Sequence, residues 1–223
     1  MIDFVSSSMK PAPRKRNFHD HFRAAPRTTA KTDRIDTSST TEKIADDLMR
    51  RTFRMLFEAI DGRPNTKGGA YRLEMLPTTC HVYFGEVCLA SADGRSEGQP
   101  VSEGISPVQG ADRHGPTAVL KSASKMDHIK TGGTLLNMKF TPALLEGDGG
   151  IDNLHSLVRA YFKLDGHHMQ FNVVTAELLR QAKADPASHR DLIVRVAGYS
   201  DYFCDLSPAL QDEIIGRTEH EGF

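Results

Sequence analysis

The sequence has no tryptophan, only three cysteines and no long apolar run. Cys80, Cys88 and Cys204 follow neither CxxC nor zinc-finger spacing, and so few cysteines in an odd number favour a reducing cytoplasm over a disulfide framework. No stretch reaches the roughly 20 consecutive apolar residues that span a bilayer. A formal net charge of -1 gives no global attraction to nucleic acid or to an anionic membrane. We therefore expect a cytoplasmic protein with no metal site, no membrane partner and no nucleic-acid partner.

The 223 residues, 39% of them hydrophobic and 26% charged, are typical of one large domain with a tail. Residues 1–41 differ from the rest, because they are rich in basic residues and keep no regular period. We predict a flexible, disordered basic leader there. No apolar segment follows its basic residues, so a secretory signal is not indicated. A nucleic-acid arm is the alternative, but no aromatic stacking set accompanies the charge.

Residues 42–102 begin with a predicted amphipathic helix, which Gly62 ends as a C-cap glycine. Next, Cys80, Val82 and Phe84 alternate with polar positions, which predicts a half-buried strand. Residues 91–116 are rich in Gly, Pro and Ser and should form a long ordered loop. The apolar face expected on the first helix consists of Ile44, Leu48, Thr52, Met55, Leu56, Ala59 and Ile60.

A second amphipathic helix is predicted between residues 151 and 162, followed by a strand over residues 169–173. Gln170 and Asn172 share one polar face of this strand, where they either line a pocket or face solvent. Thr175 is expected to cap a third helix, which must stop before Pro186. The apolar positions of the second helix are Ile151, Leu154, Leu157, Val158, Tyr161 and Phe162.

The last forty residues predict a strand, a glycine turn and a helix. Residues 192–196 form a nearly continuous apolar run, as expected of a strand buried on both faces. Residues 197–200 form a turn, and Ser207 and Pro208 stand as N-cap and first residue of a helix. The fold class is therefore α/β, in which functional groups tend to lie just past the C-terminal ends of strands.

The segment from Leu192 to Ser200, with Arg195-Val196-Ala197-Gly198-Tyr199 at its centre, resembles the radical-site motif of the glycyl radical enzymes. This is the superfamily of pyruvate formate-lyase. The resemblance continues through residues 201–206, 211–215 and 217–219 and extends over about residues 42–223. The upstream segments that share it are Asp61–Asn65, Gly104–Pro107, Gly115–Ala118, Lys125–His128 and Gly132–Asn137.

The resemblance implies the incomplete C-terminal portion of a glycyl radical enzyme α/β barrel. Residues 42–102 then correspond to the end of the barrel domain and residues 103–223 to the glycine radical domain. Gly198 is implied as the catalytic, modified residue that stores the radical. Its loop is supported by Arg195, Val196, Ala197 and Tyr199. The plainer interpretation is that Gly198 is a structural turn glycine.

Glycine suits this chemistry because an α-carbon radical delocalises over its flanking amides only when the carbon is planar. Glycine has no Cβ to obstruct that geometry or a close approach of neighbours. The buried strand and the capped helix are expected to shield the loop from oxygen, which cleaves the backbone at the radical. The family implies that a radical S-adenosylmethionine, iron–sulfur activating enzyme installs the radical, so no bound cofactor is expected in this chain.

In the family, the stored radical generates a thiyl radical on a cysteine of an upstream Gly-Cys-Val-Glu-like loop. Cys80, Cys88 and Cys204 do not match that setting, and Cys204 is expected to act as a small buried hydrophobe. The chain alone is therefore expected to be inactive. Its C-terminal residues resemble the dehydratase and lyase branch, most closely the trans-4-hydroxyproline dehydratase group, although formate C-acetyltransferase is a name shared across the superfamily.

Three functional hypotheses remain open from the sequence. The first is the radical-storing C-terminal fragment of a dehydratase-type enzyme. The second is an autonomous spare-part protein that docks onto a damaged barrel in trans and restores its radical. The third is a turn-rich binding module without enzymatic activity. Under the first two hypotheses, the chain without a covering barrel should expose the apolar residues from Leu192 to Val196 and should aggregate.

Overall fold

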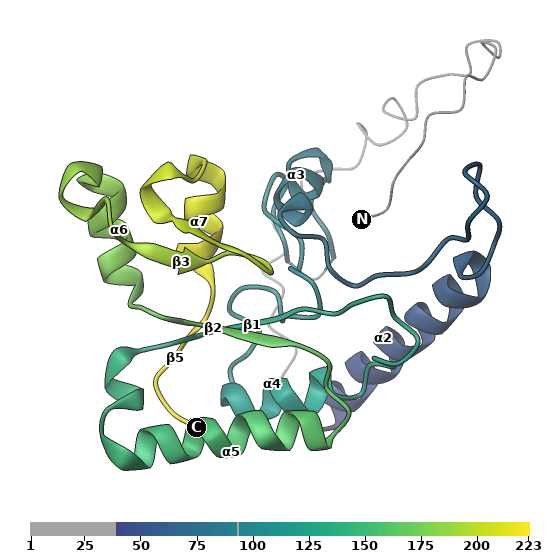
Figure 1. The fold of residues 1–223 in the computed structure, drawn as a ribbon, viewed down its shortest axis with the longest axis horizontal. Coiled ribbons are helices and arrows are strands. Elements are labelled where there is room, and N and C mark those ends of the chain that lie inside the picture. The colour runs from purple at the N-terminus through teal and green to yellow at the C-terminus, as the bar shows by residue number, and fades with distance from the viewer. Residues whose placement is uncertain (1–38, 93) are drawn as a thin grey trace, which may run out of the picture.

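A computed structural model describes residues 39–92 and 94–223 as a mixed α/β fold. The predicted leader lies outside the described residues except at its end, where a helix already begins at Ser39. A three-stranded parallel sheet runs through the middle of the molecule (Figure 1). Its strand order is β2-β1-β5, with β1 at Leu136–Phe140, β2 at Met169–Val173 and β5 at Glu219–His220. No helix of the described residues is long and apolar enough to cross a membrane.

Helices α4 (Gly115–Ala123) and α5 (Gly147–Lys163) cover one face of this sheet (Figure 1). A short 3-10 turn, η1 (Pro142–Leu145), joins β1 to α5. All five residues of β1 are buried, because β1 is the central strand between two parallel neighbours. The second predicted helix is thus confirmed, although Ile151 and Phe162 remain half exposed. The core on this face comprises Val119, Leu120, Ala123, Leu136, Met138, Phe140, Leu157 and Tyr161.

The opposite face carries helices α6 (Ala176–Ala184) and α7 (Pro208–Gly216) and a two-stranded hairpin. Both predicted helix starts are confirmed: Thr175 Oγ1 accepts from Leu178 N at 3.2 Å, and Ser207 Oγ accepts from Leu210 N at 3.4 Å. Helix α6 ends before Pro186, where η2 (Pro186–His189) begins. The core here joins Leu135, Val174, Leu179, Ala182, Val194, Val196, Phe203, Leu210 and Ile214.

The predicted strand–glycine loop–helix is corrected to a hairpin followed by a helix. Strand β3 (Ile193–Arg195) pairs antiparallel with β4 (Ser200–Tyr202), and η3 (Phe203–Asp205) separates the hairpin from α7. Nor is the apolar run buried on both faces, because Val194 is 1% exposed and Ile193 is 59% exposed. Strand β4, the antiparallel partner of β3, consists of exposed residues, so one face of the hairpin is open to solvent. The apolar run in the sequence gives no sign of this partner.

Helix α2 (Ser39–Ile60) confirms the first predicted helix but not its packing. Its apolar contacts to the rest of the chain come from Phe53, with Met49 and Phe57 beside it, and its buried Asp46 bonds Ser122 and Lys125. The expected apolar face is turned outward instead, with Ile44 55% and Leu48 54% exposed. Gly62 follows the helix with φ +75°, the left-handed conformation expected of a C-cap glycine.

The predicted strand at residues 80–84 is wrong, since this segment forms helix α3 (Cys80–Val87). A pattern of only five residues is too short to separate a strand from a helix, and here tertiary contacts decide. His81 and Val82 are buried, whereas Tyr83 and Phe84 face outward. The long loop predicted after it is confirmed over the described residues up to the start of α4 at Gly115.

Candidate functional site

The candidate site is the turn that joins β3 to β4. Val196 N donates to Tyr199 O at 2.9 Å across this turn, and Gly198 has φ +77°. Val196 and Ala197 are buried in the core, so the turn is anchored from below. Gly198 and Tyr199 are exposed, and Tyr199 is 39% exposed. The expectation that this chain's own strand and helix shield Gly198 is therefore wrong.

Gly198 is required here by its backbone conformation and not by lack of room. A Cβ built on it would meet only Leu135 Cδ1, at an ordinary contact distance of 3.8 Å. The close approach expected from the sequence is absent among the described residues. The positive φ, however, disfavours every residue with a side chain.

Side chains from β2 bind the strand that leads into the turn. Asn172 contacts both backbone groups of Arg195: Arg195 N donates to Asn172 Oδ1 at 2.7 Å, and Asn172 Nδ2 donates to Arg195 O at 2.8 Å. Gln170 Oε1 accepts from Gly198 N at 3.1 Å and from Arg195 Nε at 2.9 Å. The polar face of β2 is thus buried against the hairpin, and its residues do not face solvent.

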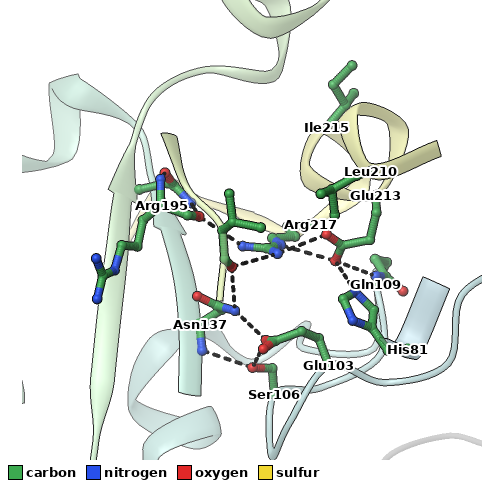
Figure 2. A network of polar contacts seen from close by, with 12 residues as sticks. His81, Glu103, Ser106, Gln109, Asn137, Arg195, Leu210, Glu213, Ile215 and Arg217 are labelled. Atoms are coloured by element: carbon green, nitrogen blue, oxygen red, sulfur yellow. Dashed lines mark hydrogen bonds and ion pairs between the residues drawn. The ribbon is translucent and has the colours of Figure 1, made fainter. Parts of the chain in front are cut away.

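A second set of polar contacts continues below the turn (Figure 2). Asn137 Nδ2 donates to Val196 O at 3.3 Å and also bonds the Glu103 carboxyl, while its backbone N donates to Ser106 Oγ at 2.8 Å. Burial raises the pKa of Glu103 above its usual value, although the Arg217 charge and the bonds from Asn137 and Ser106 act against it. Burial thus acts against the charged form of this carboxyl beneath the turn.

Arg217, which follows α7, holds the turn from another direction (Figure 2). Its guanidinium donates to Arg195 O at 3.3 Å and to Val196 O at 3.1 Å. It also binds Glu213 through two hydrogen bonds of 3.1 Å and 2.8 Å. Each of the two carbonyls therefore accepts from two directions. Arg195 O accepts from Asn172 on β2 and Val196 O from Asn137 on β1, and both accept from Arg217 at the end of α7.

Glu213 connects this arrangement to α3 and to the long loop. Its carboxylate lies 3.5 Å from His81 Nε2 and accepts from Gln109 Nε2 at 3.1 Å. Burial alone would raise the pKa of Glu213, but the His81 ring and the Arg217 guanidinium outweigh it and lower the pKa to about 2. Glu213 is therefore a carboxylate at neutral pH, fully paired in the interior.

The cysteine side chains make none of these contacts. Cys80 is exposed, and Cys88 and Cys204 are partly buried. Cys204 packs against the core below the hairpin, with its Sγ 3.3 Å from His189 O, which agrees with the role of a small hydrophobe. Within the described residues, no three or more His, Cys, Asp or Glu side chains are placed to hold a metal ion.

The structure brings together the five residues of the predicted radical loop and adds partners that sequence reasoning did not identify. Arg195, Val196, Ala197, Gly198 and Tyr199 form the turn and its first strand. Polar side chains inside apolar strands were the available signal for Asn137, Gln170 and Asn172. For Glu103, Glu213 and Arg217 the sequence carried no such signal, because nothing in it indicates which charged residues are buried.

Comparison with known proteins agrees with this site. The family described as Glycine radical matches residues 101–204. Trans-4-hydroxy-L-proline dehydratase of Clostridioides difficile is 59% identical over 175 residues, which are 78% of this chain and 22% of that protein. Isethionate sulfite-lyase of Desulfovibrio desulfuricans is 48% identical over 66% of this chain and 18% of its own length.

Solved structures give the same result. The chain superposes on hydroxyproline dehydratase from Clostridioides difficile with a TM-score of 0.77 and 58% identity, covering 79% of this chain and 22% of that one. The B12-independent glycerol dehydratase from Clostridium butyricum gives a TM-score of 0.76 at 44% identity, again over 79% and 22%. This chain therefore spans about a fifth of the length of the relatives it matches. It carries the glycine radical domain of the dehydratase- and lyase-type glycyl radical enzymes.

Proposed function

We propose that Gly198 stores an unpaired electron on its α-carbon, and that Arg195, Val196, Ala197 and Tyr199 form the loop that presents it. The observation that carries this proposal is the contrast within the turn: the backbone before Gly198 is held by buried side chains, whereas Gly198 itself is exposed. A fixed loop with an accessible glycine at its tip suits a residue that must exchange hydrogen atoms with other groups.

Installing the radical means removing one hydrogen atom from Cα of Gly198. A radical S-adenosylmethionine activating enzyme with an iron–sulfur cluster supplies this step in our proposal, and the exposure of Gly198 supports its access. The α-carbon then becomes planar and shares the electron with its two flanking amides. Gly198 has no Cβ that would resist this change.

The stored radical would act on a cysteine thiol outside the described site. It takes the thiol hydrogen, which restores the Gly198 Cα–H bond and leaves a thiyl radical to attack the substrate. We propose that a larger barrel, in the same chain or in trans, supplies this cysteine and covers Gly198. In this scheme residues 42–102 belong to the end of the barrel and residues 103–223 form the radical domain. Since oxygen cleaves such a radical, the reaction belongs in an anaerobic cytoplasm.

The relatives suggest the class of substrate. Their names describe a trans-4-hydroxy-L-proline dehydratase, an isethionate sulfite-lyase and a glycerol dehydratase. We propose elimination from a small hydroxylated compound, with trans-4-hydroxy-L-proline favoured by the 59% identity. The chain alone would store the radical without turning over this compound.

Anaerobic incubation with a radical S-adenosylmethionine activating enzyme, followed by electron paramagnetic resonance, tests the proposal. We expect a glycyl doublet in the wild-type chain and none in Gly198→Ala. Admitting air should then cleave the wild-type backbone at residue 198, which mass spectrometry detects. A wild-type sample without a doublet, or a doublet that persists in Gly198→Ala, would contradict the proposal. Gly133→Ala, at a glycine whose added Cβ meets nothing within 4 Å, is the matched control.

A further inference from the structure

One side chain of the site reaches the proposed radical residue directly. Gln170 Oε1 accepts from Gly198 N at 3.1 Å, whereas the Asn172 side chain on the same strand binds Arg195. Both side chains belong to β2, point to the same face and are buried to the same degree, with 6% exposed. The two residues therefore divide the turn between them: Asn172 holds its first strand and Gln170 its glycine.

We infer that Gln170 is a positioning residue for the radical, which holds the Ala197–Gly198 peptide plane through the hydrogen bond from Gly198 N. This inference rests on the proposed function. It goes further by assigning a role to a residue of β2, 28 positions before Gly198 in the sequence.

The carboxamide of Gln170 has a defined orientation. Its Nε2 donates to Val196 O at 3.3 Å and to the Asn137 side-chain oxygen, and its Oε1 accepts from Arg195 Nε at 2.9 Å. Because each end of the amide faces partners of the complementary type, a flipped amide would place donors against donors. Gln170 Oε1 is thus held in place to accept from Gly198 N before any radical forms.

Holding this peptide plane matters to the radical for a geometric reason. The nitrogen of Gly198 shares the unpaired electron only while its peptide plane is aligned with the planar α-carbon. A hydrogen bond from the N–H to a fixed oxygen limits rotation of that plane. The carbonyls of residues 195 and 196 are fixed by Asn172 and Arg217, so loss of Gln170 frees Gly198 while leaving the strand before it in place.

Amide hydrogen exchange of the full chain, read residue by residue by nuclear magnetic resonance, tests the inference without a radical. Gln170→Met replaces the carboxamide by an apolar side chain of similar length, and Asn172→Leu is the matched control. We expect Gly198 N–H to exchange about tenfold faster in Gln170→Met, the factor that loss of one hydrogen bond gives. Asn172→Leu should accelerate Arg195 N–H and leave Gly198 N–H close to its wild-type rate.

Electron paramagnetic resonance of the activated chain gives the second measurement. Gln170→Met should show a doublet of altered splitting, because the orientation of Gly198 relative to its amides changes. Gln170→Glu keeps an oxygen acceptor for Gly198 N–H but loses the donor to Val196 O and Asn137, so its splitting should lie nearer to the wild type than that of Gln170→Met. Asn172→Leu should keep that splitting as well, which separates a specific effect of Gln170 from a general loosening of the hairpin.

The outcomes separate this inference from the proposed function. A wild-type chain without a doublet contradicts the proposed function, while the exchange rates still decide whether Gln170 holds Gly198. Equal exchange of Gly198 N–H in wild type and Gln170→Met overturns the inference whether or not a radical forms. An equal effect of Gln170→Met and Asn172→Leu on Gly198 also overturns it. If Gln170→Met fails to fold, the wild-type chain decides: protection of the Gly198 N–H from exchange supports the inference, and unprotected exchange overturns it.

Discussion

At the scale of single residues, two glycines with positive φ illustrate different requirements. Gly198 has φ +77° and open space at the position that a Cβ would take, where the nearest atom is Leu135 Cδ1 at 3.8 Å. Gly104 has φ +56°, and a Cβ added there would lie 2.5 Å from Leu135 O. The first position excludes side chains by backbone strain alone, and the second by strain together with a clash against backbone.

This difference gives a prediction for stability. We expect Gly198→Ala to lower the free energy of unfolding by roughly 1–2 kcal/mol, the cost of a left-handed conformation for a residue with a Cβ. Gly104→Ala should lower it by at least about 3 kcal/mol, because overpacking against Leu135 O adds to that strain. Urea unfolding followed by circular dichroism measures both. A Gly198→Ala chain that is as unstable as Gly104→Ala would contradict the open surroundings of Gly198.

The sequence identifies Gly198 and its loop but not the side chains that hold them. The Arg-Val-Ala-Gly-Tyr segment is contiguous, so its pattern is visible in the sequence. Its partners come from β1, β2 and the end of α7, up to 59 residues away in the case of Asn137 and Val196. For Gln170 and Asn172, alternation places both on one strand face, but only the position of the hairpin shows that this face is buried.

At the scale of secondary-structure elements, the end of α7 is joined to the hairpin and to α3 by a buried ion pair. The side chains of Arg217 and Glu213 are 9% and 0% exposed, and His81 on α3 lies against the same carboxylate. Removing one partner of such a pair leaves an uncompensated charge in the interior. The contact therefore couples three elements around the turn.

We predict that the stability of the folded chain depends on pH through the ionisation of Glu213. Its pKa in the folded chain is about 2, below the ordinary value of 4.5 expected when unfolded. The stabilisation is therefore fully present above pH 4.5 and is lost as the pH falls through 2. It amounts to about 3 kcal/mol, and we expect Glu213→Gln to destabilise the chain by a similar amount at neutral pH.

Thermal melts from neutral pH down to about pH 2 check this prediction. Glu213→Gln should show a flatter loss of melting temperature below pH 4.5 than the wild-type chain. Asp212→Asn is the control on the same helix, because Asp212 pairs with Lys183 at the surface and its side chain is 65% exposed. That variant should change stability by less than about 1 kcal/mol. Parallel pH profiles of wild type and Glu213→Gln would show that Glu213 is not the titrating group.

Secondary structure follows from the sequence where local signals are strong, and it does not where a distant partner decides. The Thr175 and Ser207 caps and the glycine at residue 62 follow from local backbone chemistry, and the structure confirms them. Helix α3 has the apolar alternation of a strand in its sequence. Its buried residues include His81 and Val82, which contacts with distant segments determine and the alternation does not predict. The hairpin is not visible in the sequence, since the residues of β4 are polar and exposed and give no apolar pattern.

At the scale of the whole molecule, two sets of exposed apolar side chains lie on α2 and around α3. On α2 they are Ile44, Leu48, Met55 and Leu56, and around α3 they are Tyr83, Phe84, Val87 and Leu89. The sequence predicts such a surface at residues 192–196, and this is correct only in part: Ile193 is 59% exposed, whereas Val194 and Val196 are buried in the core. Helical periodicity identifies the α2 stripe, yet it does not distinguish a face packed in this chain from one left open.

This surface leads to a prediction about association. Contiguous exposed apolar patches on soluble chains mark interaction sites or promote aggregation. We expect the purified chain to self-associate, with a mass above that of one 24.7 kDa chain in light scattering coupled to size-exclusion chromatography. Leu48→Gln combined with Met55→Gln should shift the chain toward monomer without lowering its melting temperature, because both side chains are more than half exposed.

Phe53→Ala is the control on the packed side of α2, where the Phe53 side chain is 5% exposed, and it should instead destabilise the fold by about 3–5 kcal/mol. A monomeric wild-type chain with a sharp cooperative melt would show that these patches do not drive association, and the need for a covering barrel would then rest on the exposure of Gly198 alone.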